Sequence, residues 1–246
     1  MTQHTALPAL HVGRGYRYGN LTWFPVWSDA PELERRYTTD IARLEISELE
    51  AETVPHLKVR NPGDTSAVVF EGSVFVGGFQ TRTLTKTSFV PAATEAVLPV
   101  LCVESQRWGG HGRSHRVGDM IAPSRVRSAA RGVTREPARA PQNARQGQVW
   151  NQVASYQARH SAPAPTHSLA DINQHVRNRA MDEETIPEVK ALPGQRGVII
   201  ASLGQPMSME LFDHPDTLAE RLQALLESVR LDVLDQGYVE TPSRRA

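Results

Sequence analysis

The first half of the chain is a succession of short apolar runs separated by turn residues, and this pattern constrains the fold more than any other feature. One strand is predicted over 44–48, where Leu44, Ile46 and Glu48 alternate with their neighbours. Residues 57–70 predict a β-hairpin around an Asn-Pro-Gly-Asp turn. Antiparallel strands joined by short turns build a sandwich or a barrel-like sheet, and we expect one here.

A regular alternation follows a Gly-Gly pair in the middle of this half. Thr recurs at every second position from Thr81 to Thr87. Because successive side chains of a strand point to opposite faces, the threonines share one face and Gln80 and Arg82 share the other. We predict a half-buried Thr face, with Gln80 and Arg82 beside flexible glycines, where a ligand can reach them.

The second half of the chain has a different pattern. Helical spacing of apolar residues predicts helices within 147–160 and 168–180, and an acidic, Pro-containing linker follows over 182–196. Residues 197–212 predict a β-hairpin. A long helix then begins near Asp213, and its apolar face would be formed by Leu218, Leu222, Leu225, Val229 and Val233. The predicted fold class is therefore α+β: a β-rich N-terminal half, then helices, then a hairpin plus long helix.

The chain has 246 residues, of which 39% are hydrophobic, which suits one globular domain. The predicted organisation is a flexible leader (1–15), a single α+β domain (16–236) that contains a basic Arg-rich loop (about 107–145), and a flexible tail (237–246). Within that loop, one short helix is expected near 121–131. The loop carries nine Arg against two acidic residues.

Charge and cysteine content exclude several function classes. Basic and acidic residues balance at 27 each, so no global field attracts nucleic acid or an anionic membrane. Cys102 is the single cysteine, which fits a reducing cytoplasm and excludes a Cys-based zinc cluster. We expect no metal site, because His111 and His115 lack the acidic residue of an HExxH motif.

There is no apolar stretch of membrane-spanning length and no signal-peptide pattern, so a cytoplasmic protein is predicted.

Five segments in a fixed order resemble one known family, the ARG and Rhodanese-Phosphatase-superfamily-associated protein domain. They are GNLTWFPV (19–26), EGSVFVGGFQTR (71–82), LPVLCVESQRW (98–108), GQVW (147–150) and the closing segment 197–229. The resemblance implies a setting among ADP-ribose-handling and NAD-handling proteins, without implying a reaction. Two positions depart from the family pattern, because Ser73 replaces a Glu and Thr81 replaces an Asn.

Polar residues beside the glycines and at the end of a strand predicted over 96–104 are candidates for a ligand site. They are Glu71, Gln80, Arg82, Glu104 and Arg107, with Trp108 as a stacking surface. Arg recognises phosphate or carboxylate with a fork of N–H groups, and an indole stacks on a base. In the alternative interpretation, Arg82 pairs with Glu71 across the sheet, and Trp108 covers the core beside a solvated or paired Arg107.

Catalytic candidates are weaker, and they are Cys102, Glu104 and Glu71. A nucleophilic Cys102 needs a base, and Glu104 is two residues along the same strand face, about 7 Å away. A buried and inert Cys102 is the alternative. The chain carries no GxGxxG motif after a strand, no P-loop and no GxSxG motif, so the cofactor stays open.

These observations leave three hypotheses for function. The first is a domain that binds or processes an NAD-like, ADP-ribose-like or other phosphorylated nucleotide ligand. The second is a non-enzymatic interaction module, in which the Arg-rich segment of one subunit meets the acidic residues of 182–240 in another and forms a homo-oligomer. The third and weakest is nucleic-acid binding through the Arg-rich segment, which lacks interleaved aromatic residues.

Overall fold

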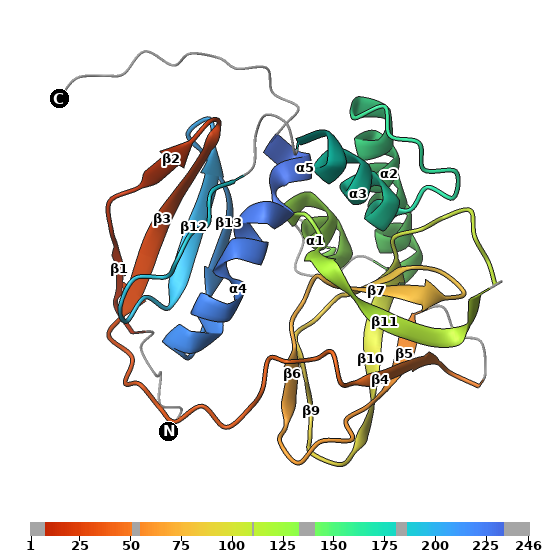
Figure 1. The fold of residues 1–246 in the computed structure, drawn as a ribbon, viewed down its shortest axis with the longest axis horizontal. Helices are drawn as coiled ribbons and strands as arrows, with labels where there is room; N and C mark the ends of the chain where they lie inside the picture. The colour runs from red at the N-terminus through yellow and green to blue at the C-terminus, as the bar shows by residue number, and fades with distance from the viewer. Residues whose placement is uncertain (1–7, 51–54, 110, 133–140, 181–185, 234–246) are drawn as a thin grey trace. The chain divides into compact units, whose positions relative to one another are not determined.

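The computed structural model describes residues 8–50, 55–109, 111–132, 141–180 and 186–233. The chain divides into two compact units. Unit 1 consists of residues 1–35, 186–226 and 236–246, and unit 2 consists of residues 36–185 and 227–235. Each unit contains strands and helices, which confirms the predicted α+β class (Figure 1).

Unit 1 is built on one antiparallel sheet that combines the two ends of the chain. Its strands are β1 (Leu10–Val12), β2 (Tyr16–Tyr18), β3 (Leu21–Ser28), β12 (Gly197–Ser202) and β13 (Gln205–Leu211). Their order is β1-β3-β12-β13, and β2 also pairs with β3. The predicted C-terminal hairpin is therefore confirmed as β12–β13, and helix α4 (Pro215–Ser228) follows it alongside the sheet (Figure 1).

The unit 1 sheet and α4 follow from the apolar pattern of their sequences. Leu21, Trp23 and Val26 of β3 are buried, as are Leu218 and Leu222 of α4. The predicted long helix ends sooner than expected, because α4 stops at Ser228 and the short helix α5 (Arg230–Val233) follows. Residues 10–12, which the sequence places in a leader, form β1 and pair with β3.

Unit 2 contains a closed six-stranded antiparallel barrel, which confirms the predicted barrel-like sheet. The barrel strands are β4 (Glu45–Glu48), β5 (His56–Arg60), β7 (Ser73–Gly78), β8 (Arg82–Leu84), β10 (Glu95–Cys102) and β11 (His111–Ile121). They close in the order β10-β5-β4-β11-β7-β8. Two further strands, β6 (Ala67–Val69) and β9 (Ser88–Val90), form a separate two-stranded sheet.

The predicted hairpin over 57–70 is wrong. β5 pairs with β4 and β10 in the barrel, whereas β6 pairs with β9. The turn instead redirects the chain out of the barrel, and the buried Asn61 holds it there. The Asn61 Nδ2 group donates to the carbonyl oxygens of Thr65 at 2.9 Å and of Val90 at 3.0 Å. The chain does turn at the predicted Asn-Pro-Gly-Asp segment, where the Gly63 N–H donates to Asn61 Oδ1 at 3.0 Å, but the strands that it joins belong to different sheets.

The alternating-Thr strand is divided into β8 and β9, and both faces of its first part are buried. Thr81, Thr83 and Thr85 are buried, and so are Gln80 and Arg82 on the opposite face. One face of the strand contacts the barrel interior, whereas the other lies towards the packed helices. The expectation of a half-buried Thr face is therefore wrong at Thr81, Thr83 and Thr85, and Arg82 on the opposite face is fully buried.

Residue alternation along the barrel strands separates two apolar cores in unit 2. Phe75, Leu84 and Val100 belong to the core inside the barrel. Val74 and Leu101, one residue away from these, belong to a second core that is shared with helices. These helices are α1 (Ser124–Arg131), α2 (Gln142–Arg159) and α3 (Leu169–Ala180). Leu231 of α5 also joins this second core.

The Arg-rich segment is not a loop in its described residues. It contains strand β11, helix α1 and the start of helix α2. Helix α1 confirms the helix expected near 121–131. Only one face of β11 contacts the barrel core, so every second residue of this strand can be polar. The Arg-rich composition of the segment therefore did not indicate a strand. Trp150 of α2 is 37% exposed, whereas its neighbour Val149 is buried.

The tail predicted over 237–246 lies outside the described residues, as does the first part of the acidic linker. The described part of the linker begins with Ile186, which is buried. Among the helices in the described ranges, none combines the length and the hydropathy that crossing a bilayer requires.

Candidate functional site

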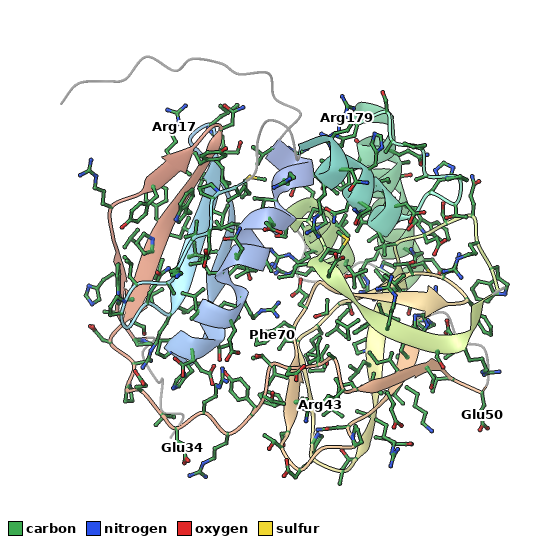
Figure 2. The ribbon with its side chains drawn as sticks, in the orientation of Figure 1. Arg17, Glu34, Arg43, Glu50, Phe70 and Arg179 are labelled. Carbon is green, nitrogen blue, oxygen red and sulfur yellow. The ribbon has the colours of Figure 1, made fainter. Side chains whose placement is uncertain are left out.

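Four polar side chains occupy positions that the barrel alternation assigns to its interior. Each is two residues along its strand from an apolar core residue: Glu48 from Ile46, Arg82 from Leu84, Cys102 from Val100, and His115 from Val117. All four are buried, with exposed fractions of 7% or less. Arg43 and Glu50, which are labelled in Figure 2, are exposed instead, as is usual for charged side chains. Buried charges require partners, so the contacts of the four groups define the site.

Arg82 is at the centre of this cluster, and its side chain is fully buried. Register places Cys102 of β10 directly opposite it. Its Nη1 group donates to Gln80 Oε1 at 2.9 Å and also contacts Cys102 Sγ. Its Nη2 group lies 3.6 Å from Glu48 Oε1, an ion pair without a hydrogen bond. Within the described residues, Nε and Nη2 of Arg82 have no hydrogen-bond partner.

Glu48 joins Arg82 to His115. The Glu48 Oε1 atom lies 3.0 Å from His115 Nε2 and accepts the N–H of Phe79 at 3.1 Å. Burial alone would raise the pKa of Glu48, but the His115 hydrogen bond, the Arg82 charge and the Phe79 N–H outweigh it and lower that pKa. Glu48 is therefore a carboxylate at neutral pH. The imidazole reaches it by lying directly against Gly78, whose φ is +52°.

A second buried ion pair, Glu104–Arg107, adjoins the Arg82 cluster. Glu104 Oε2 accepts from Arg107 Nη2 at 2.7 Å and from the Thr81 N–H at 2.8 Å. Arg107 also donates to the carbonyl oxygens of Gly78 at 2.7 Å and Gly77 at 3.1 Å. Burial opposes ionisation of Glu104, but the donors from Arg107, Thr81 and Thr166 prevail and lower its pKa to about 2. Arg107 is thus fixed in place by structural contacts.

Trp108 lies at the outer side of this cluster. The residue is 55% exposed, and the centroid of its ring lies 5.8 Å from Arg82 Cζ and 5.7 Å from the Phe79 ring centroid. The indole therefore separates the fully buried guanidinium from solvent and presents an open face. A cation–π contact of this geometry is favourable but weak.

Glu71 is not part of the cluster. Its carboxylate accepts from Arg131 Nε at 2.7 Å, and its N–H donates to Thr87 Oγ1 at 3.0 Å. The alternative in which Arg82 pairs with Glu71 is therefore wrong, because Arg82 pairs with Glu48. The structure brings together Gln80, Arg82, Cys102 and Trp108, places the Glu104–Arg107 pair beside them, and leaves Glu71 apart.

Cys102 is a thiol in this environment. Burial raises its pKa to about 11, and the charge and hydrogen bond of Arg82 only partly offset that effect. Glu104 is occupied by Arg107 and Thr81, and Glu48, with its lowered pKa, is a weak base. Among the described residues, Arg82 contacts Cys102 Sγ and supplies fixed charge and a hydrogen-bond donor to it.

A family model, the ARG and Rhodanese-Phosphatase-superfamily-associated Protein domain, matches residues 9–246. The chain belongs to this family. The match covers both units, so the family domain is the whole two-unit arrangement. Compared with curated proteins and with solved structures, the chain shows no significant match to either.

Sequence reasoning missed three buried groups of this family domain. Glu48 continues the inward alternation of Leu44 and Ile46, and an acidic residue at an inward position is a signal that could have identified it. His115 was considered only as a metal ligand. Gln146, which directly precedes the GQVW motif within α2, drew no attention because a single polar residue in an Arg-rich segment has no distinctive spacing.

Gln146 takes the place of a neighbouring strand on the β5 side of β10, beyond the end of the β10–β5 pairing. Its Oε1 accepts the Cys102 N–H at 2.9 Å, and its Nε2 donates to the Cys102 carbonyl at 2.8 Å. A carboxamide thereby replaces the peptide group of a missing strand, because β5 pairs with β10 only as far as Pro99. Both backbone groups of Cys102 would otherwise be buried without partners on that side.

Gln146→Leu should therefore lower the free energy of unfolding by about 2–4 kcal/mol, because two buried backbone groups each lose a partner at about 1–3 kcal/mol. Urea unfolding followed by far-UV circular dichroism measures the change. Gln148→Leu is the matched control, since Gln148 is exposed on the same helix and should change stability by no more than about 0.5 kcal/mol. Equal effects of the two substitutions would contradict the assigned role of Gln146.

Proposed function

We propose that this family domain binds a phosphorylated, nucleotide-like ligand of the NAD or ADP-ribose class at the Trp108 end of the barrel. The observation that carries the proposal is Arg82, a fully buried guanidinium whose Nε and Nη2 groups lack hydrogen-bond partners within the described residues. Unpaired buried donors are costly, and a phosphate oxygen is the acceptor that best matches a guanidinium fork.

Trp108 would provide both the entry path of the ligand and the surface on which its base stacks. A turn of the indole about its side-chain torsions would open a path to Arg82 and leave the ring face available for stacking. Glu48 would not be stranded by this change, because it keeps its contacts with His115 and with the Phe79 N–H. Gln80 would remain beside the guanidinium as a polar group for the ligand.

Binding is tested by calorimetry of the full chain with ADP-ribose, NAD, AMP and inorganic phosphate. ADP-ribose or NAD should bind and raise the melting temperature. Trp108→Ala should weaken this binding roughly 10-fold or more, because stacking of a base on an aromatic ring is worth about 1–3 kcal/mol. Trp150→Ala removes another part-exposed indole, outside the cluster, and should leave binding unchanged.

Two outcomes would count against this function. One is that none of the four ligands binds at millimolar concentration. The other is that Trp108→Ala and Trp150→Ala weaken binding equally, because the loss would then have no connection with the Arg82 cluster. Binding of phosphate alone with the affinity of ADP-ribose would restrict the ligand class to small anions.

The second candidate function is a homo-oligomerisation module, in which the Arg-rich segment of one subunit would pair with acidic residues of another. One contact within the chain concerns this pairing. Arg125 of the basic segment lies 3.7 Å from Asp232, an acidic residue of the C-terminal third. Asp232 also accepts from the Ser124 hydroxyl at 2.8 Å and from Tyr156. Basic and acidic segments thus meet within one chain at this point, which favours an intramolecular over an intersubunit use of these two residues.

A further inference from the structure

A cavity of about 270 Å³ lies within unit 1, and it is independent of the barrel site proposed above. One wall is formed by Tyr16 of β2 with Trp23 and Pro25 of β3. The opposite wall is formed by the segment that precedes β12, including Val189, and Leu222 of α4 also lines the space. All of these residues belong to the same unit, so the cavity is a property of that unit alone.

The first wall presents an aromatic surface. Tyr16 and Trp23 are directly opposite one another in the register of β2 and β3. Their ring centroids are 5.9 Å apart, with an angle of 18° between the ring planes. Trp23 is buried, whereas Tyr16 is 47% exposed. Near-parallel rings of which one remains half open offer a flat π surface to a further ring.

The second wall is held in place by hydrogen bonds on both sides. The Val189 N–H donates to Gln223 Oε1 of α4 at 2.9 Å. Trp27 Nε1 donates to the carbonyl oxygen of Pro193 at 3.0 Å. Gln195 accepts the Leu192 N–H at 2.9 Å and donates to the Gly197 carbonyl at 2.8 Å. The cavity is therefore preformed, and a ligand would not have to order the segment on binding.

The polar groups of the lining specify a neutral ligand. Lys190 and Glu188 lie 3.7 Å apart with side chains 84% and 77% exposed, so their charges offset one another in solvent. The buried Gln195 carboxamide is already engaged by backbone groups. The remaining surface is apolar or aromatic. An engineered cavity of about 150 Å³ binds benzene. By comparison, the volume of the unit 1 cavity accommodates one ring or two fused rings.

From this geometry we infer that the unit 1 cavity binds a neutral planar aromatic molecule of one or two rings, which stacks on Tyr16. Such a ligand has no charge to desolvate and buries an apolar surface that matches the walls. A saturated ring of the same size loses the stacking contribution and binds more weakly. Anionic aromatic molecules bind more weakly still, because no unpaired cation in the described lining receives them.

Ligand-observed NMR titrations of the full chain with indole, phenol, cyclohexanol and benzoate test this inference. Indole and phenol should bind more tightly than cyclohexanol and benzoate. Tyr16→Ala should weaken indole binding roughly 3- to 10-fold, as expected for one aromatic pair. Tyr18→Ala is the matched control: Tyr18 lies on the same strand and the same sheet face as Tyr16 but does not line the cavity.

A second variant keeps the test informative if Tyr16→Ala disturbs β2. Val189→Phe fills the cavity from the opposite wall and should abolish indole binding without removing any hydrogen bond of the Val189 backbone. Failure of indole and phenol to bind at millimolar concentration would overturn the inference, and so would equal affinity in the wild type and Val189→Phe. Neither result would affect the barrel site, which is measured with phosphorylated ligands.

Discussion

Glu104→Gln should lower the free energy of unfolding at pH 7 by about 3 kcal/mol, the usual cost of breaking one side of a buried ion pair. The amide keeps the size of the carboxylate but loses its charge. Its NH₂ group must also face a donor, because Arg107 and Thr81 direct N–H groups at both carboxylate oxygens. Urea unfolding measures the total decrease in the free energy of unfolding. Hydrogen exchange at the Thr81 amide shows whether the decrease arises near Glu104.

The dependence of this loss on pH is a stricter test. The folded-state pKa of Glu104 is lowered to about 2 from its ordinary 4.5. Its stabilisation is therefore fully present above about pH 4.5 and disappears as the pH falls towards 2. The difference between wild type and Glu104→Gln should shrink over that window. Glu71→Gln, which breaks the more exposed pair with Arg131, should cost less than about 1 kcal/mol. A pH-independent difference would contradict the assigned ionisation of Glu104.

Gly78→Ala should destabilise unit 2 by roughly 2–5 kcal/mol, as the sum of backbone strain and overpacking. A methyl group on Gly78 would lie 2.7 Å from Cδ2 of His115 and closer still to Nε2. The imidazole would have to leave Glu48, and the buried carboxylate would lose its hydrogen bond. Thermal unfolding measures the destabilisation.

Two controls separate the clash from the backbone strain. Gly19 has a φ of +55°, close to the +52° of Gly78, but no atom lies within 4 Å of an added methyl group. Gly19→Ala should therefore report strain alone, about 1 kcal/mol. In a His115→Ala background, Gly78→Ala should likewise cost only the strain. If His115→Ala does not reduce the cost of Gly78→Ala, the imidazole is not what requires glycine at this position.

The sequence predicted elements well where a single period operates. The C-terminal hairpin and helix were found because β12 is continuously apolar and α4 repeats Leu218, Leu222 and Leu225 on one face. The barrel-like sheet was anticipated from the density of strands and turns. The strand pairing was not anticipated. The sequence of the turn at Asn61 does not indicate whether the turn joins two paired strands or two strands of different sheets.

The candidate site was predicted in part, for reasons that lie in tertiary contacts. Gln80, Arg82 and Trp108 do lie together, since the start of β8 pairs with the end of β10, which Trp108 follows. Their partners could not be inferred, because Glu48 reaches Arg82, and His115 reaches Glu48, from strands distant in sequence. Pairing of β8 with β10 also decides that Arg82 faces inwards to Cys102, which local alternation alone leaves undetermined.

The pairing of β3 with β12 has a consequence during synthesis on the ribosome. β3 emerges with Trp23, Phe24 and Trp27, but the strand that covers its free edge begins only at Gly197. At about 5–20 residues per second, this edge waits for roughly 10–30 s. The barrel strands can pair during that interval, since all of them precede residue 122. The nascent N-terminal strands thus expose this unpaired edge while the barrel strands form, and a chaperone that binds unpaired strands would act there.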